Sequence, residues 1–178
     1  MAFIGIDSVT YGSPDLKEAR KYFADWGLKK IADTRSGITF ETGVGSRIIV
    51  RPENAPTLRS RLEGGSNFRE VIFGVATASE LKGIADDLSR DREIVADTDG
   101  TLRTTDDSGI NIGFRVWKHG REHRGGGTAW NGPGNRTRVD QISPVYNCAR
   151  PFKMGHIVFF VPDTRVAESF YRKRLGFW

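Results

Sequence analysis

The sequence has little that could cross-link the chain or anchor it in a membrane. It contains one cysteine, Cys148, among 178 residues, which excludes an internal disulfide framework. Its longest apolar stretch, about eight residues around 157–161, is far shorter than the roughly 20 residues that span a bilayer. The first twelve residues carry neither a basic segment nor a long apolar one, so no secretory signal is seen. We therefore expect a cytoplasmic protein with no membrane partner.

Positive charge is present but is not concentrated. The formal net charge is +5 and the sequence pI is about 9.6, which favours anionic partners. Lysine and arginine are interleaved with aspartate and glutamate, so no helix carries the basic stripe typical of nucleic-acid binding. The densest basic patch, 118–124, runs into three glycines and is interpreted as a solvated loop. We expect a small aromatic or acidic partner and no nucleic acid.

A strand followed by a helix occurs near both ends of the chain. Residues 6–15 match residues 154–163 at an offset of 148 residues, which aligns Ser8 with His156. Both segments are rich in β-branched and aromatic residues, as strands are. The segment that follows carries apolar residues at helical spacing in both copies. These residues are Leu16, Ala19, Phe23 and Trp26 in the first copy and Val166, Phe170, Tyr171 and Leu175 in the second.

Proline and glycine mark the limits of these two predicted helices. Pro14 and Pro162 end each strand and suit the first turn of a helix. Gly27 and Gly176 lie where a helix ends in a left-handed residue.

A weaker middle copy consists of a predicted strand at 69–76 and a helix from 79 to about 88. Further strand-like runs separated by turns lie at 29–34, 37–41, 47–51, 93–97, 101–105 and 111–117. We therefore expect an N-terminal domain, 1–118, made of two βαβββ units (1–62 and 63–118). A Gly/Pro-rich linker, 119–152, leads to the strand and helix of a second, incomplete domain, 153–178.

The incomplete unit lacks partners for its apolar side chains. A strand and helix without three following strands would leave seven large residues partly exposed. They are Phe159, Phe160, Phe170, Tyr171, Leu175, Phe177 and Trp178. Either the chain is a piece of a longer protein, which is the simpler explanation, or another chain covers them in a homo-oligomer, for example by swapping the arm 153–178.

The paired units resemble the vicinal oxygen chelate superfamily, which includes glyoxalase I, bleomycin-resistance proteins and type I extradiol dioxygenases. The residues that carry the resemblance are 155–163 and, after them, Phe170–Tyr171 and Leu175–Gly176–Phe177. It implies an α+β fold in which paired βαβββ units form a cupped mixed sheet with helices outside, plus an incomplete third unit. The arrangement is most similar to a two-domain extradiol dioxygenase truncated in its third unit.

The resemblance also implies a metal site of which this chain holds one ligand. In such dioxygenases the N-terminal domain lacks metal and the C-terminal domain binds Fe(II), with Mn(II) as an alternative, through two histidines and a glutamate. The first histidine matches His156, and the other two ligands lie in a fourth unit. Two imidazoles and one carboxylate leave one side of the metal open for a catechol and dioxygen. His156 shares its predicted strand face with Val158 and Phe160, which would face the cup interior. Without the resemblance, His156 reads as a hydrogen-bonded core histidine.

The corresponding positions in the N-terminal units are Ser8, Glu70 and Gly113. One carboxylate among the three cannot hold a divalent ion tightly, so a metal-free N-terminal domain is expected.

Other candidate residues are weaker. His119 and His123 are four residues apart, but the glycines after them argue against a helical metal motif. Cys148 has no histidine nearby in the sequence and is interpreted as an incidental thiol. Trp130 and Tyr146 could cover a substrate or simply pack.

Two functions remain open at this stage. The first is an extradiol ring-cleavage dioxygenase acting on a catechol-type aromatic, here in a truncated form that is inactive on its own. The second is a metal-free small-molecule binding protein of the glyoxalase/bleomycin-resistance type.

Overall fold

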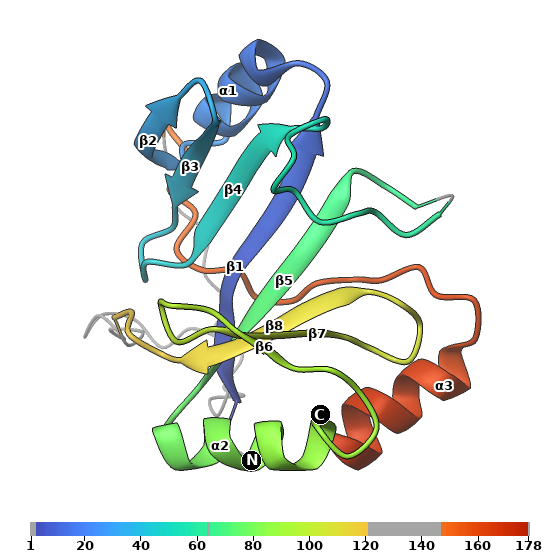
Figure 1. Ribbon diagram of the computed structural model, residues 1–178. Helices are drawn as coiled ribbons and strands as arrows, with labels where there is room; N and C mark the ends of the chain where they lie inside the picture. Colours follow the sequence, from blue (N-terminus) through green and yellow to red (C-terminus); the bar gives the residue numbers. More distant parts are fainter. Residues whose placement is uncertain (1–2, 64, 121–146, 178) are drawn as a thin grey trace, which may run out of the picture.

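A single eight-stranded mixed sheet with helices on its outer side organises the chain (Figure 1). The computed structural model describes residues 3–63, 65–120 and 147–177. In chain order the elements are β1 (Phe3–Ser13), α1 (Leu16–Asp25), β2 (Lys29–Thr34), β3 (Gly37–Glu41), β4 (Arg47–Pro52), β5 (Phe68–Val75), α2 (Ala78–Leu88), β6 (Val95–Ala96), β7 (Leu102–Thr105), β8 (Asn111–Val116), α3 (Thr164–Glu168) and the π-helical stretch η1 (Ser169–Arg174).

The two βαβββ units predicted from the sequence are confirmed. The strand order is β2-β3-β4-β1-β5-β8-β7-β6, so each unit occupies one half of the sheet. Within each half the first and last strands run parallel, β1 with β4 and β5 with β8. The halves meet where β1 and β5 pair antiparallel at the centre. This arrangement is the expected α+β fold with a cupped mixed sheet.

Local chemistry explains where the helices begin and end. The Asp15 side chain accepts hydrogen bonds from two backbone N–H groups in the first turn of α1. Thr77 and Glu80 form a reciprocal capping box at the start of α2. Gly27 (φ 78°) follows α1 and Gly176 (φ 77°) follows η1, so both predicted terminating glycines adopt the left-handed conformation.

Alternation along the central strands gives the sheet two different faces. On β5, Val71, Phe73 and Val75 are buried on the face that α2 covers with Ile84 and Leu88. The opposite face forms the concave side of the cup and carries most of the buried charged residues. The helix side therefore holds the apolar core, while the cup side is polar.

The predicted strand at 153–161 is wrong. This segment forms no strand, and residues 157, 159 and 161 pack against the core while 158 and 160 are exposed. The reason is geometric. It lies against the helix-side face of β1, and β1 has no free edge to offer because its two edges already pair with β4 and β5.

The expected exposure of the C-terminal helix is also wrong for two residues. Phe170 and Leu175 each keep only 1% of their surface exposed and belong to the same core as the N-terminal units. In Figure 1, the C-terminal helix made of α3 and η1 (red) has its last turns beside the end of α2 (green). Phe160, at 91% exposed, does remain outside the core as expected. Within the described residues, no helix is long and apolar enough to cross a bilayer.

Replacing Phe170 by alanine tests this docking. We expect a loss of about 3–4 kcal/mol in the free energy of unfolding, because a fully buried ring leaves a cavity. The matched control, Phe160→Ala on the same segment, should change stability by less than about 0.5 kcal/mol. Urea denaturation measures both. Equal, small effects would show that the C-terminal helix is not part of the core.

Candidate functional site

The concave face of the sheet encloses a cavity of about 580 Å³. Both units line it, so it spans the central β1–β5 pair. Charged side chains make up much of its lining. The charged lining residues are Arg47, Arg51, Arg59, Arg69, Arg103, Arg115, Asp7, Glu70, Asp97 and Asp99.

Two strand irregularities bring extra charges into the cup. Between β1 and β5, Ile6 pairs with Phe73 and the next pair is Ser8 with Ile72, which leaves Asp7 as an extra residue on β1. Further along, Thr10 pairs with Glu70 and Tyr11 with Phe68, which leaves Arg69 as an extra residue on β5. A β-bulge turns a side chain away from regular alternation. Asp7 and Ser8 therefore both line the cavity, as do Arg69 and Glu70.

Most of the carboxylates in the cup are paired with arginines. Glu70 is buried, and its Oε1 lies 2.9 Å from Nε of Arg103 and 3.3 Å from Nε of Arg59. Arg103 also pairs with Asp97, and Arg115 lies 3.7 Å from Asp99. Buried carboxylates need such partners because water cannot solvate them.

Asp7 is the most buried of the acids, at 1% exposed. Its Oδ1 lies 3.6 Å from Nη1 of Arg115, and its Oδ2 lies 2.7 Å from Nε2 of His119. The sequence placed His119 on a solvated loop. The structure instead buries its imidazole near Gly45, where the backbone leaves room for it. No sequence signal links residues 7 and 119, so this pair was missed.

The three positions that correspond to metal ligands in related units do not form a metal site. Ser8 and Gly113 lie in one row across the sheet, each next to Ile72, and Glu70 lies one step away on the same face. A methyl group on Gly113 would lie 2.5 Å from Cδ1 of Ile72 and 2.9 Å from the Leu102 carbonyl oxygen. A ligand side chain there would thus need a rearrangement. The two guanidinium groups beside Glu70 would repel a cation.

His156 lies outside the cup. It is exposed and borders a second cavity, of about 420 Å³, on the helix side of β1. The other lining residues of that cavity are apolar or aromatic, such as Tyr22, Trp26 and Ile48. Across residues 3–63, 65–120 and 147–177, no group of three or more His, Cys, Asp or Glu could hold a metal ion. The part of the chain that the structure describes therefore does not assemble a complete metal site around His156.

Of the weaker candidates, Cys148 is exposed. His123, Trp130 and Tyr146 lie outside the described residues.

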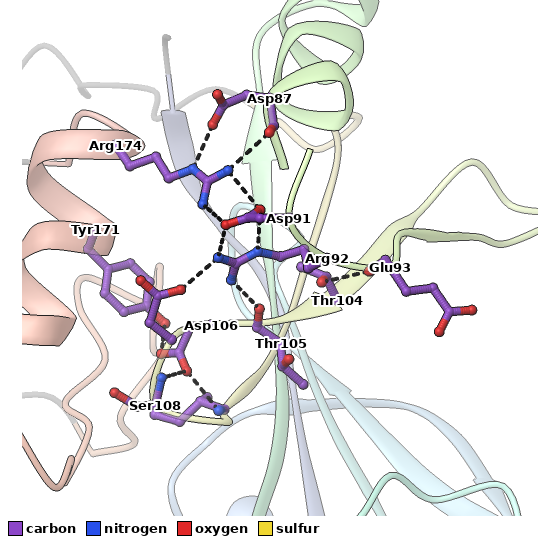
Figure 2. Close-up of polar contacts among 12 residues, drawn as sticks. Asp87, Asp91, Arg92, Glu93, Thr104, Thr105, Asp106, Ser108, Tyr171 and Arg174 are labelled. Carbon is purple, nitrogen blue, oxygen red and sulfur yellow. Dashed lines mark hydrogen bonds and ion pairs between the residues drawn. The ribbon is translucent and has the colours of Figure 1, made fainter. Parts of the chain in front are cut away.

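A polar network docks the C-terminal helix, and with it the segment that carries His156 (Figure 2). The Arg174 guanidinium bridges α2 and the turn after it, with Nε 2.7 Å from Asp87 and Nη1 2.7 Å from Asp91. Arg92 lies on the other side of Asp91 and also pairs with Asp107. Hydrogen bonds from Arg174 and then Arg92 hold the pKa of Asp91 well below its ordinary value.

A second contact ties the same helix to the β7–β8 turn. The Tyr171 hydroxyl donates to Oδ2 of the buried Asp106 at 2.8 Å. Oδ1 of Asp106 accepts from the backbone N–H groups of Ser108 and Ile110, both at 2.8 Å. Burial, and after it the Asp106 charge, raises the pKa of Tyr171 far above its ordinary value. The hydroxyl therefore stays protonated in the folded chain.

Comparison with known proteins identifies the fold. No family model and no curated protein matches the sequence. Among solved structures, a halotolerant catechol dioxygenase matches with a TM-score of 0.65 and 16% identity, over 99% of this chain and 56% of that one. A catechol 2,3-dioxygenase matches with a TM-score of 0.63 and 15% identity, over 97% and 58%. An extradiol ring-cleaving dioxygenase from B. fuscum matches with a TM-score of 0.53 and 14% identity, over 67% and 34%.

These matches show that the chain shares the fold of these dioxygenases, which is the α+β fold of paired βαβββ units expected from the sequence. The chain spans a little over half the length of the first two enzymes.

Tyr171→Phe tests the contact with Asp106. The ring contacts with Phe159 and Phe73 are retained in this variant, so it isolates the hydroxyl. We expect a loss of about 2 kcal/mol at neutral pH, the usual worth of a hydrogen bond to a charged group.

The pH dependence supplies a second readout. Above pH ~10 the unfolded chain releases the Tyr171 proton while the folded chain keeps it, so stability falls as pH rises. The stability of the Tyr171→Phe variant does not depend on this proton. The difference in free energy of unfolding between wild type and variant should therefore shrink between pH ~9 and ~11. A deficit that stays constant over that range in urea titrations would contradict the raised pKa.

Proposed function

We propose that this chain is part of an extradiol ring-cleavage dioxygenase that acts on a catechol-type aromatic, and that His156 supplies one ligand of its Fe(II) centre. The observation that carries the proposal is the extent of the structural match. Two catechol dioxygenases align with 99% and 97% of this chain. The alignment thus extends beyond the two βαβββ units into the segment around His156.

The proposal assigns different roles to the two parts of the chain. The N-terminal unit pair is the metal-free half. Glu70 is the one carboxylate at its three ligand positions, and it is already ion-paired with Arg59 and Arg103. His156 is exposed, so ligands from outside the described residues could reach a metal ion bound to it. Fe(II), held by two imidazoles and a carboxylate, would supply the binding of both catechol oxygens and of dioxygen.

One histidine cannot fix an oxygenase iron, so the 178-residue chain should be inactive by itself. The test begins with protein whose intact mass confirms that it ends at Trp178. After anaerobic loading with Fe(II), we expect well under one iron per chain and no catechol-dependent consumption of dioxygen.

In the decisive experiment, the chain is produced together with any polypeptide that its coding DNA encodes beyond Trp178. We expect one iron per chain and dioxygen consumption with catechol, both lost in His156→Ala. Ser8→Ala, the matching position in the first unit, should retain both. Iron and activity that survive His156→Ala would overturn the role of His156.

Two other outcomes are informative. Near-stoichiometric iron in the 178-residue chain, lost in His156→Ala, would show that a neighbouring chain in a homo-oligomer completes the site. Absence of iron under all conditions would contradict the dioxygenase proposal and favour a metal-free binding protein.

A further inference from the structure

The charges of the cup do not balance. Among the described residues, six arginines and four carboxylates line it, which leaves an excess of positive charge. All four carboxylates lie against Arg59, Arg103 or Arg115. The excess positive charge therefore comes from the other three arginines. Arg47 and Arg51 are on β4, and Arg69 is near the start of β5.

Of these three, Arg47 and Arg51 have only modest partners. Nε of Arg47 lies 3.9 Å from Oε2 of Glu41, and half of the Arg47 side chain is exposed. Nη1 of Arg51 donates to the Thr57 hydroxyl at 3.0 Å, which satisfies one of its five N–H groups but not its charge.

Arg69 has no such partner. The residue is 6% exposed, and its Nε is fully buried without a hydrogen-bond acceptor in the described residues. No carboxylate within those residues lies in ion-pair contact with it. Burying an unpaired guanidinium costs several kcal/mol, a cost that an anion in the cavity would offset.

The absence of a side chain at Gly12 makes room for the Arg69 guanidinium in the cup. A methyl group on Gly12 would come within 2.7 Å of both Nε and Nη2 of Arg69, so the guanidinium lies directly over this glycine. In the parallel β1–β4 ladder, Gly12 pairs with Arg51. Arg51 and Arg69 therefore lie on either side of the same glycine, at one end of the cavity.

We propose that this end of the cup binds the carboxylate or phosphate group of a small organic anion through Arg51 and Arg69. Paired guanidinium forks match the planar or tetrahedral oxyanion, and a low local dielectric strengthens the contact. Ile49, Leu58 and Ile72 line the rest of the cavity and would contact a small hydrocarbon body. The site needs no metal and is independent of the ring-cleavage proposal.

Isothermal titration calorimetry on the 178-residue chain at low ionic strength tests this site. The probes are benzoate, phenyl phosphate and the neutral benzamide. We expect saturable 1:1 binding of one or both anions and no binding of benzamide. The stronger anion identifies whether the natural group is a carboxylate or a phosphate.

Variants assign the binding to the two arginines. Arg69→Gln and Arg51→Gln should each weaken the anion at least tenfold, the loss expected for one charge-assisted hydrogen bond. Gly12→Ala keeps both charges but displaces the Arg69 guanidinium, and should weaken binding to a similar degree. Arg90→Gln, an equal change of charge at an exposed residue in the turn after α2, should leave affinity unchanged.

Measuring the stability of the variants distinguishes the loss of the binding site from the loss of the fold. Because Arg69 is buried without a partner among the described residues, Arg69→Gln should unfold at the same urea concentration as wild type or higher. Absence of saturable binding by either anion would overturn the proposal. So would equal affinity for benzamide, or unchanged affinity in Arg69→Gln and Gly12→Ala. None of these results bears on iron binding.

Discussion

The antiparallel pairing of β1 with β5 is the interaction on which the rest of the structure depends. Each unit alone is an open sheet of four strands, and this one ladder joins the two into a continuous cup. Its helix side buries Val9 and Val71 in the shared core. Its other side forms the floor of the cavity. A fault in this pairing would therefore remove both the core and the cup.

The irregularities of the same ladder decide the chemistry of the cup. A regular β1–β5 pair would direct Asp7 and Arg69 toward the helices, where an unpaired charge would be untenable. The bulges turn both into the cavity instead. Asp7 finds Arg115 and His119 there, whereas Arg69 finds no partner among the described residues. The two bulges thus place in one cavity an acid that has ion-pair partners and an arginine that has none among the described residues.

The sequence predicted the elements with local signals well. Apolar spacing located α1 and α2 to within a residue or two, and Gly27 and Gly176 ended their helices as expected. Turn glycines separated the strands of both units. Prediction failed at 153–161, where β-branched composition indicates a strand but the segment lies over the face of β1, whose two edges pair with β4 and β5. It failed also for His119, whose partner is 112 residues away in the chain.

The sequence by itself thus determined the repeat, the α+β class and the resemblance to the vicinal oxygen chelate fold, because periodicity, caps and turns are local properties of the chain. Only the tertiary structure decided where the charges gather and where the C-terminal helix docks. Bulges shift the register by one residue, and Arg174 finds Asp87 and Asp91 only once α2 and η1 lie side by side. Contacts of this kind arise from packing between distant segments, which no local pattern records.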